Sequence, residues 1–289
     1  MDRPPPIDWP VPDAFPALGP AEVHVWCAWL DAPGVDGPHA LATLSAEEKT
    51  RAAAFHFAAD RRRYVASHVM VREVLAGYLA AESAAKVGVG FHTDAAAVAA
   101  TIAGVETGDH PVIRAAGLQF LKGPHGKPAL AGDALQFNLS HSGALALLAV
   151  ARDQAVGVDL EQRWEMPDLA IMEERMFTPA ALKRQQLLAP GLRLRGFYRR
   201  WTQLEAAGKC RGTGLELEKK MTGDEYVAPA DPAEGFTGCL ACERKPAQIG
   251  FFRYLKEVSS ALPETTASPS LTLPGLPHRL EGLAPLSFS

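Results

Sequence analysis

Residues 137–161, FNLSHSGALALLAVARDQAVGVDLE, indicate the fold class of this chain. They contain two apolar, β-compatible segments, ALALLAVARD (144–153) and AVGVDLEQR (155–163), with a turn between them. Short apolar segments that turns interrupt are typical of strands, so we expect two adjacent strands here. We place a domain boundary in this region, which divides the chain into residues 1–150 and residues 151–289.

Helical patterns lie on both sides of these strands. We expect helices over residues 45–57, 60–85, 169–188 and 193–209, and a further strand over residues 23–30. Within residues 169–188, Thr178 and Pro179 could open a new helix. The first helix opens with Ser45 and Glu48, which are three residues apart in the pattern of a capping box. Gly212 and Gly214 follow the last helix and are expected to end it. Because helices and strands interleave without regular βαβ spacing, we predict an α+β fold of two packed halves.

Composition argues against several classes of protein. The 289 residues carry a formal net charge of −4, and a chain without a basic surplus is not suited to non-specific nucleic-acid binding. No apolar run reaches the roughly 18 to 20 residues that span a bilayer, and the first residues lack the layout of a signal peptide. We therefore expect a cytoplasmic protein that does not contact membranes. Cys239 and Cys242 form a lone C-x-x-C, which we expect to be two buried thiols in a strand rather than a zinc site.

The motif GVDLE (157–161) holds the first candidate site residues. Residues two apart on a strand face the same side, so Asp159 and Glu161 would present two carboxylates together while Leu160 packs away from them. Two like charges beside an apolar strand repel each other and lose hydration, so they need a cation or another compensating group. Magnesium, a hard ion that binds oxygen ligands and substrate phosphates, is the natural candidate. A pair of solvent-facing carboxylates at a strand end is the alternative.

The helix FYRRWTQLEAAGKCR (197–211) carries two further candidates. Glu205 and Lys209 are four residues apart and therefore share one face of the helix. One interpretation is a surface ion pair of little energetic weight. The other is that Glu205 is a third metal carboxylate, while Lys209 neutralises phosphate or helps to move a proton from an attacking hydroxyl.

Three more positions could contact a phosphate. Ser140 and His141 can both donate hydrogen bonds, although a structural role is the alternative; as strand neighbours they point to opposite faces and cannot form a nucleophile–base pair. Arg63 lies in the basic run DRRRYVASHVMVR (60–72), which fits either phosphate binding or a solvated helix start. Lys127 lies in a turn beside a glycine, where the backbone can approach a ligand closely.

The order and spacing of these clusters resembles the 4′-phosphopantetheinyl transferases. The matching motifs, which lie between Leu44 and Leu215, are RRRYVASHVMVR, GKPAL, FNLSHSG, GVDLE and FYRRWTQLEAAGKCRGTGL. The nearest type is the larger, two-half kind that includes the surfactin-synthetase activator. The resemblance implies two similar α+β halves related by a pseudo-twofold, a coenzyme A site between them, and a monomeric protein.

The resemblance also implies roles for individual residues. Asp159, Glu161 and Glu205 match the magnesium carboxylates of the family, and Glu205 and Lys209 match its catalytic glutamate and lysine. The implied coenzyme A contacts are Arg63, Lys127, Ser140, His141, Asp159 and Lys209. By this resemblance the chain transfers 4′-phosphopantetheine from coenzyme A to a serine of an apo acyl or peptidyl carrier protein, with Mg²⁺, and releases adenosine 3′,5′-bisphosphate.

One departure from the family pattern keeps other functions open. Leu204 stands where the family usually has a lysine, immediately before the metal-binding glutamate. A relative that binds coenzyme A or a carrier protein without transfer is therefore one alternative. A magnesium-dependent phosphohydrolase that uses the same carboxylates is another, and a purely structural protein is a third.

Overall fold

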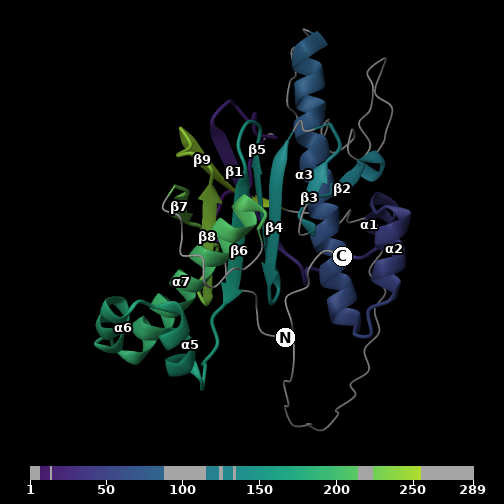
Figure 1. Cartoon of the computed structure of the whole chain (residues 1–289). Helices are drawn as coiled ribbons and strands as arrows, with labels where there is room; N and C mark the ends of the chain where they lie inside the picture. Colours follow the sequence, from purple (N-terminus) through teal and green to yellow (C-terminus); the bar gives the residue numbers. More distant parts are fainter. Residues whose placement is uncertain are drawn as a thin grey trace.

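The structure, a computed structural model, describes residues 7–13, 15–87, 115–123, 126–132, 135–213 and 224–254. Two β-sheets lie at the centre of the molecule, and helices flank them on both sides (Figure 1). This arrangement confirms the predicted α+β fold class. The pseudo-twofold relation between two similar halves stays a prediction.

The first sheet is built around β5 (Leu145–Ala151), which is buried along its whole length. Its strand order is β4-β5-β1-β9. β4 (Gln136–Ser142) and β1 (Glu22–Trp29) pair with β5 in antiparallel fashion. β9 (Gln248–Tyr254) pairs with β1 in parallel, so a strand from late in the chain completes a sheet made mostly of earlier strands.

The second sheet has the order β6-β8-β7 and is antiparallel. Its strands are β6 (Val156–Gln162), β7 (Tyr226–Pro229) and β8 (Phe236–Cys242). β8 is fully buried and contains Cys239 and Cys242, both of which are free thiols. The prediction of two small buried thiols in a strand is confirmed.

The predicted division between residues 150 and 151 falls at the end of β5. Two features tie the parts of the chain together across it. β9 pairs with β1 over seven register positions, from Glu22 with Gln248 to Ala28 with Tyr254. One core cluster also combines buried residues of β1 and β5 with buried residues of β6 and β8. The division into two domains stays a prediction.

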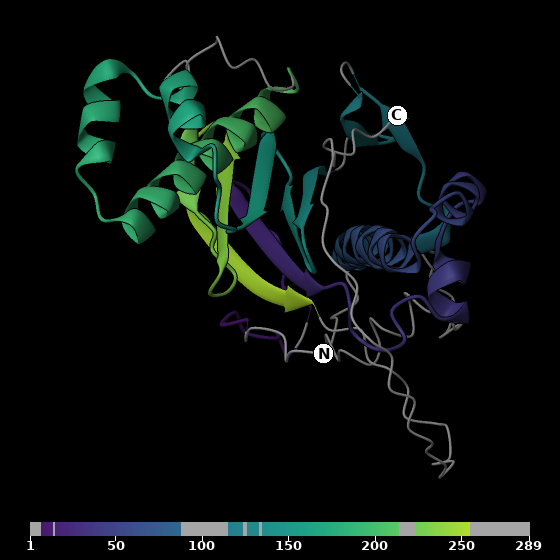
Figure 2. The ribbon, with the colours of Figure 1, turned by 90° about the horizontal axis from the view of Figure 1, so that it is seen from below.

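The helices of the first part lie against the first sheet. α3 (Ala58–Val87) lies against one face of that sheet. α1 (Pro38–Thr43) and α2 (Ala46–Ala53) lie beyond α3, on the side that faces away from the sheet (Figure 2). The predicted capping box opens α2: Ser45 Oγ accepts from the N–H of Glu48 at 3.2 Å, and the Glu48 carboxylate accepts from the N–H of Ser45 at 2.8 Å. Among the described residues, no helix is both long enough and apolar enough to cross a bilayer.

The helices of the second part lie on the other side of the sheets (Figure 2). They are α5 (Leu169–Met176), α6 (Pro179–Gln186) and α7 (Pro190–Arg211). α7 ends at Gly212, which has φ +72° and ψ 21° in the left-handed region that favours glycine. The predicted end of this helix is confirmed at Gly212, whereas Gly214 lies outside the described residues.

A short hairpin follows a 3₁₀ turn at Ala115–Gly117. Its strands are β2 (Phe120–Lys122) and β3 (Pro128–Leu130), which pair antiparallel. The N–H of Gly123 donates to the carbonyl of Lys127 at 2.8 Å and closes the loop between them. The hairpin therefore holds Lys127 at the base of a glycine-rich turn.

Candidate active site

Asp159 and Glu161 direct their carboxylates toward the same neighbour, strand β4. Ser140 Oγ donates to Asp159 Oδ1 at 3.0 Å, and Ser142 Oγ donates to Glu161 Oε2 at 3.0 Å. Leu160, between the two acids, belongs to the apolar core with 1% of its surface exposed. This is the arrangement expected of residues that alternate along a strand.

Asp159 is the most buried acid of the site. It is 3% exposed, and its Oδ1 atom also accepts from Lys209 Nζ at 2.7 Å. Burial raises the pKa of the Asp159 carboxyl, while the Lys209 ammonium and the Ser140 hydroxyl oppose the shift. The other oxygen, Asp159 Oδ2, is buried and has no hydrogen-bond partner in the described part of the chain. An unpaired buried carboxylate oxygen is costly, so this atom indicates a ligand that the chain itself does not supply.

Glu161 is held from two elements. Its Oε2 atom accepts from Ser142, and its Oε1 atom accepts from Trp201 Nε1 of α7 at 3.2 Å. Burial raises the pKa of Glu161, the negative charge of Asp159 raises it further, and the two hydrogen bonds oppose the shift. The carboxylate is therefore oriented but not neutralised, because neither Ser142 nor Trp201 carries a charge.

α7 brings Glu205 and Lys209 to the same place. Lys209 Nζ donates to Ser140 Oγ at 3.0 Å as well as to Asp159. Burial raises the pKa of Glu205 to about 7, with contributions from the negative charges of Asp159 and Glu161 and an opposing one from Lys209. Among the described residues, Glu205 has no hydrogen-bond partner. The structure thus places three acids and one lysine in a single electrostatic neighbourhood.

Gly157 lets α7 approach β6 this closely. A Cβ atom at this position would lie 2.1 Å from the carbonyl oxygen of Ala206 and 2.3 Å from the backbone nitrogen of Cys210. Only glycine fits where backbone meets backbone at such distances. The glycine of the GVDLE motif is therefore the contact point that sets Glu205 and Lys209 of the helix beside the two strand acids.

The donor set fits magnesium, although no complete cage is formed. Within the described ranges, no group of three His, Cys, Asp or Glu side chains is arranged to hold a metal ion. The unpaired Oδ2 atom of Asp159 nevertheless favours an added cation, as do the pKa values of Glu161 and Glu205, which burial and the negative charge of Asp159 raise. Magnesium takes oxygen ligands, and it is usually bound through one or two carboxylates together with substrate phosphates.

His141, on β4, lies close enough to Lys209 and Arg63 for their charges to act on its ring. Its ring is exposed, yet the protein atoms around it lower its pKa, and the positive charges of Lys209 and Arg63 lower the pKa further. Arg63, on α3, forms a two-pronged ion pair with Asp31, with Nε–Oδ1 2.9 Å and Nη2–Oδ2 2.7 Å. Cations of α7 and α3 therefore lie within electrostatic reach of His141 on β4, and positive charge grouped in this way suits an anionic ligand.

Lys127 contacts backbone carbonyls rather than the acids of the site. Its ammonium donates to the carbonyl of Val156 at 2.9 Å and to that of Cys210 at 3.3 Å. Burial lowers its pKa. Cys210 belongs to the last turn of α7, where unpaired carbonyls attract a cation. In this structure Lys127 thus joins the β2–β3 hairpin to α7 and β6, and its contact with coenzyme A stays a prediction.

Ser142 and Trp201 are site residues that the sequence analysis did not identify. A signal for Ser142 was present, because Ser140 and Ser142 are two residues apart, as Asp159 and Glu161 are. Trp201 precedes Glu205 by one helical turn and therefore shares its face. Neither spacing shows which residues meet, since β4 and α7 are far apart in sequence.

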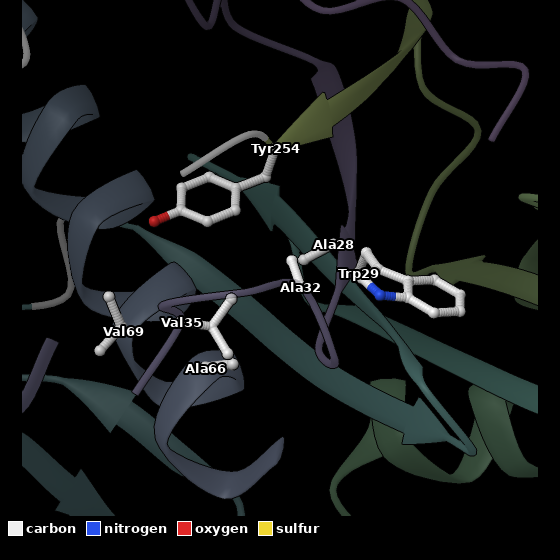
Figure 3. A pocket seen from close by; sticks show the side chains of 7 residues that line it. All are labelled: Ala28, Trp29, Ala32, Val35, Ala66, Val69 and Tyr254. Atoms are coloured by element: carbon white, nitrogen blue, oxygen red, sulfur yellow. The ribbon is translucent and has the colours of Figure 1, made fainter. Parts of the chain in front are cut away.

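A small hollow of about 70 Å³ lies between the first sheet and α3 (Figure 3). Ala28, Trp29 and Tyr254 border it from the sheet side, and Ala66 and Val69 border it from α3. All of its lining residues are alanine, valine, tryptophan or tyrosine. It contains none of the acids or cations described above, so it is separate from the charged site.

Comparisons with known proteins agree with this geometry. Residues 155–246 match the 4'-phosphopantetheinyl transferase superfamily. The chain is 33% identical to the 4'-phosphopantetheinyl transferase HetI of Nostoc sp. over 217 residues, which cover 74% of this chain and 77% of HetI. It is 34% identical over 95 residues to the 4'-phosphopantetheinyl transferase AcpT of Salmonella typhi, covering 32% of this chain and 50% of that protein. It is 26% identical over 191 residues to the L-aminoadipate-semialdehyde dehydrogenase-phosphopantetheinyl transferase of Mus musculus, covering 62% of this chain and 52% of the relative.

Proposed function

The chain belongs to the 4′-phosphopantetheinyl transferases, and from this premise we propose that it moves the phosphopantetheine arm of coenzyme A onto a serine of an apo acyl or peptidyl carrier protein. The products would be the holo carrier protein and adenosine 3′,5′-bisphosphate. The observation that carries the proposal is the unpaired, buried Oδ2 atom of Asp159 beside two further acids and a lysine.

Asp159, Glu161 and Glu205 are the carboxylates that would bind the metal ion, although in this structure the three do not together form a metal-binding group. Asp159 and Glu161 contribute from β6, and Glu205 contributes from α7. When bound, magnesium supplies positive charge at the diphosphate of coenzyme A and helps to orient the phosphorus that is attacked. The raised pKa of all three carboxyls supports this role, because each is a group whose negative charge is incompletely compensated by the chain.

Glu205 would accept the proton of the carrier serine, directly or through a water molecule. A general base works best when its pKa lies near the working pH, and burial raises the pKa of Glu205 to about 7. The deprotonated serine oxygen then forms a bond to the β-phosphorus as the bond from that phosphorus to the leaving bisphosphate breaks. Lys209, which reaches Asp159 and Ser140 in this structure, would stabilise the charge that develops on the phosphoryl oxygens.

The remaining predicted ligands would bind the phosphates of coenzyme A. His141 lies close enough to Lys209 and Arg63 for their positive charges to lower its pKa. Arg63 is paired with Asp31 here, so a phosphate contact at Arg63 requires that ion pair to be exchanged. Ser140 is more restricted. A hydroxyl has one proton and two lone pairs, and here Ser140 donates to Asp159 and accepts from Leu160 and Lys209. A phosphate contact at Ser140 therefore requires one of these bonds to be exchanged.

Mass spectrometry of a purified apo carrier protein tests the proposal. The full chain is incubated with the carrier, coenzyme A and magnesium, and a gain of roughly 340 Da, the mass of one phosphopantetheine, is expected on the carrier. Binding of coenzyme A without this gain would favour an impaired relative. Release of phosphate or nucleotide in the absence of any carrier would favour a phosphohydrolase, and either result would reject the transferase reaction.

A further inference from the structure

β4 and β6 lie edge to edge between the two sheets, and side chains rather than backbone carbonyls join them. β4 is the edge of the first sheet and β6 is the edge of the second. Three side chains of β4, spaced two residues apart, accept hydrogen bonds from three backbone N–H groups of β6 with the same spacing. The contacts are Asn138 Oδ1 with Val158 N at 2.8 Å, Ser140 Oγ with Leu160 N at 3.3 Å, and Ser142 Oγ with Gln162 N at 3.0 Å. We call this set of contacts the β4–β6 ladder.

The two serine hydroxyls of the ladder also donate hydrogen bonds to the strand acids. Each accepts from one N–H of β6, which leaves its single proton free for another acceptor. Ser140 gives that proton to Asp159, and Ser142 gives it to Glu161, both at 3.0 Å. The register of the ladder therefore determines where both carboxylates lie, because each acid directly precedes the residue whose N–H its serine accepts.

Asn138 differs from the two serines of the ladder, because no acid lies beside it on β6. The residue before Val158 is Gly157, which has no side chain to receive a proton. Asn138 contributes an amide oxygen, which accepts but has no hydroxyl proton to direct onward. At this rung β6 meets the backbone of α7 instead, at Ala206 and Cys210. The two serines of the ladder thus each contact an acid, whereas the asparagine lies opposite the point where Gly157 gives way to α7.

Glu161 depends on the ladder more than Asp159 does. Asp159 also has the charged partner Lys209, whereas Glu161 is held by Ser142 on one oxygen and by Trp201 on the other. The indole of Trp201 is itself fixed by the ring of Phe197, with centroids 6.4 Å apart and planes 21° apart. Each carboxylate oxygen retains a lone pair after accepting one hydrogen bond, so a metal ion could still bind.

We propose that Ser142 and Trp201 are positioning residues, which orient Glu161 toward the metal ion while the β4–β6 ladder sets the register of the two strand acids. This inference rests on the proposed function, because it takes Asp159, Glu161 and Glu205 as the magnesium carboxylates. Partners that orient a metal ligand in this way typically change metal affinity or activity by about 10- to 100-fold when they are removed.

Binding of Mn²⁺ to the full chain in the presence of coenzyme A tests the proposal without any turnover. Free Mn²⁺ is measured by electron paramagnetic resonance. Ser142→Ala and Trp201→Phe are each expected to weaken Mn²⁺ binding about 10-fold. Ser142→Thr keeps the hydroxyl and should retain most of the affinity. Ser67→Ala is the matched control, because the Ser67 hydroxyl donates to the Tyr64 carbonyl and contacts His68 Nδ1, both within α3, and contacts no acid of the site.

Unchanged Mn²⁺ affinity in a folded Ser142→Ala or Trp201→Phe variant would overturn the proposal. It would also be overturned if Ser142→Thr and Ser67→Ala lost as much Mn²⁺ affinity as Ser142→Ala. Thermal melting checks the fold of each protein. If Ser142→Ala does not fold, Trp201→Phe decides, since it keeps an aromatic ring at this position. Transfer to a carrier by the unaltered chain is measured separately. If the unaltered chain transfers nothing but the variants show the expected changes in Mn²⁺ affinity, only the proposed reaction is rejected. If it does transfer but the Ser142→Ala and Trp201→Phe variants bind Mn²⁺ unchanged, only this inference is rejected.

Discussion

At the scale of single residues, Glu205 has the environment of a proton acceptor. Burial and the nearby charges of Asp159 and Glu161 raise its pKa to about 7, and the described part of the chain offers it no hydrogen bond. The negative charge at this position is therefore poorly compensated by the chain. A proton or a cation can supply the compensation, and a bound cation favours the ionised form of the carboxyl.

Glu205→Gln should lower the rate of carrier modification by about 100-fold or more, because an amide neither accepts the proton nor offers a charged oxygen to a metal ion. The rate is measured by mass spectrometry of the carrier, and melting temperature should stay close to that of the unaltered chain. Glu174→Gln, on the exposed side of α5, is the control and should leave the rate unchanged. Normal turnover by Glu205→Gln would contradict the assignment.

His24 should make the stability of the protein depend on pH. It is 4% exposed on β1, with Nδ1 2.7 Å from the Tyr78 hydroxyl. Burial lowers its pKa to about 4, while Glu22 opposes the shift. Because the pKa is lower in the folded state than the ordinary value of about 6.5, the unfolded chain binds the proton first. The stabilisation is complete above pH 6.5 and is lost as the pH falls toward 4.

Urea unfolding at a series of pH values measures this contribution. The unaltered chain should lose a few kcal/mol more than a His24→Gln variant between pH 6.5 and pH 4. Glutamine can still accept a hydrogen bond from Tyr78 but does not titrate, so it isolates the charge. Parallel curves for the two proteins over this range would show that His24 is not the titrating group.

At the scale of elements, the contact between α7 and β6 decides whether the site exists. The helix supplies Glu205, Lys209 and Trp201, and the strand supplies Asp159 and Glu161. Their closest approach is at Gly157, where there is no room for a Cβ atom. A shift of the helix by one methyl group would move every helix-borne group relative to the strand acids.

Gly157→Ala should destabilise the protein by about 1 to 3 kcal/mol, the usual cost of overpacking, and should also weaken metal binding. Gly191→Ala is the control on the same helix, because an added Cβ there meets nothing within 4 Å. It should be neutral or stabilise by up to about 1 kcal/mol, since alanine favours a helix over glycine. Urea unfolding compares the two variants, and equal free energies of unfolding would show that the close contact does not matter.

At the scale of the whole molecule, the two sheets share one core. Buried residues of β1 and β5 pack with those of β6 and β8, and β9 returns from the second part of the chain to pair with β1. Elements that bury each other in this way cannot unfold independently without exposing large apolar surfaces.

We therefore expect a single unfolding transition in urea. Trp26 reports on the first sheet and Trp201 reports on α7, so fluorescence samples both parts of the chain. Fluorescence and far-ultraviolet circular dichroism should give the same midpoint. Two separated midpoints would indicate that residues 1–150 and 151–289 unfold as independent domains.

Local patterns were sufficient for the features that depend on neighbours along the chain. The capping box at Ser45, the end of α7 at Gly212 and the common side of Asp159 and Glu161 follow from spacings of two to four residues. Backbone geometry imposes these relations wherever a helix or strand forms. The sequence by itself thus determined these local features and indicated the acids, whereas α1 and the β2–β3 hairpin had no clear pattern in it.

Only the tertiary structure decided which side chains meet. Lys209 reaches Asp159 across 50 positions, and Trp201 reaches Glu161 across 40. The ladder between β4 and β6 joins residues 20 positions apart, and Lys127 donates to carbonyls rather than to a site acid. Such contacts depend on strand register and on how helices pack on sheets, and a periodic pattern along one chain specifies neither.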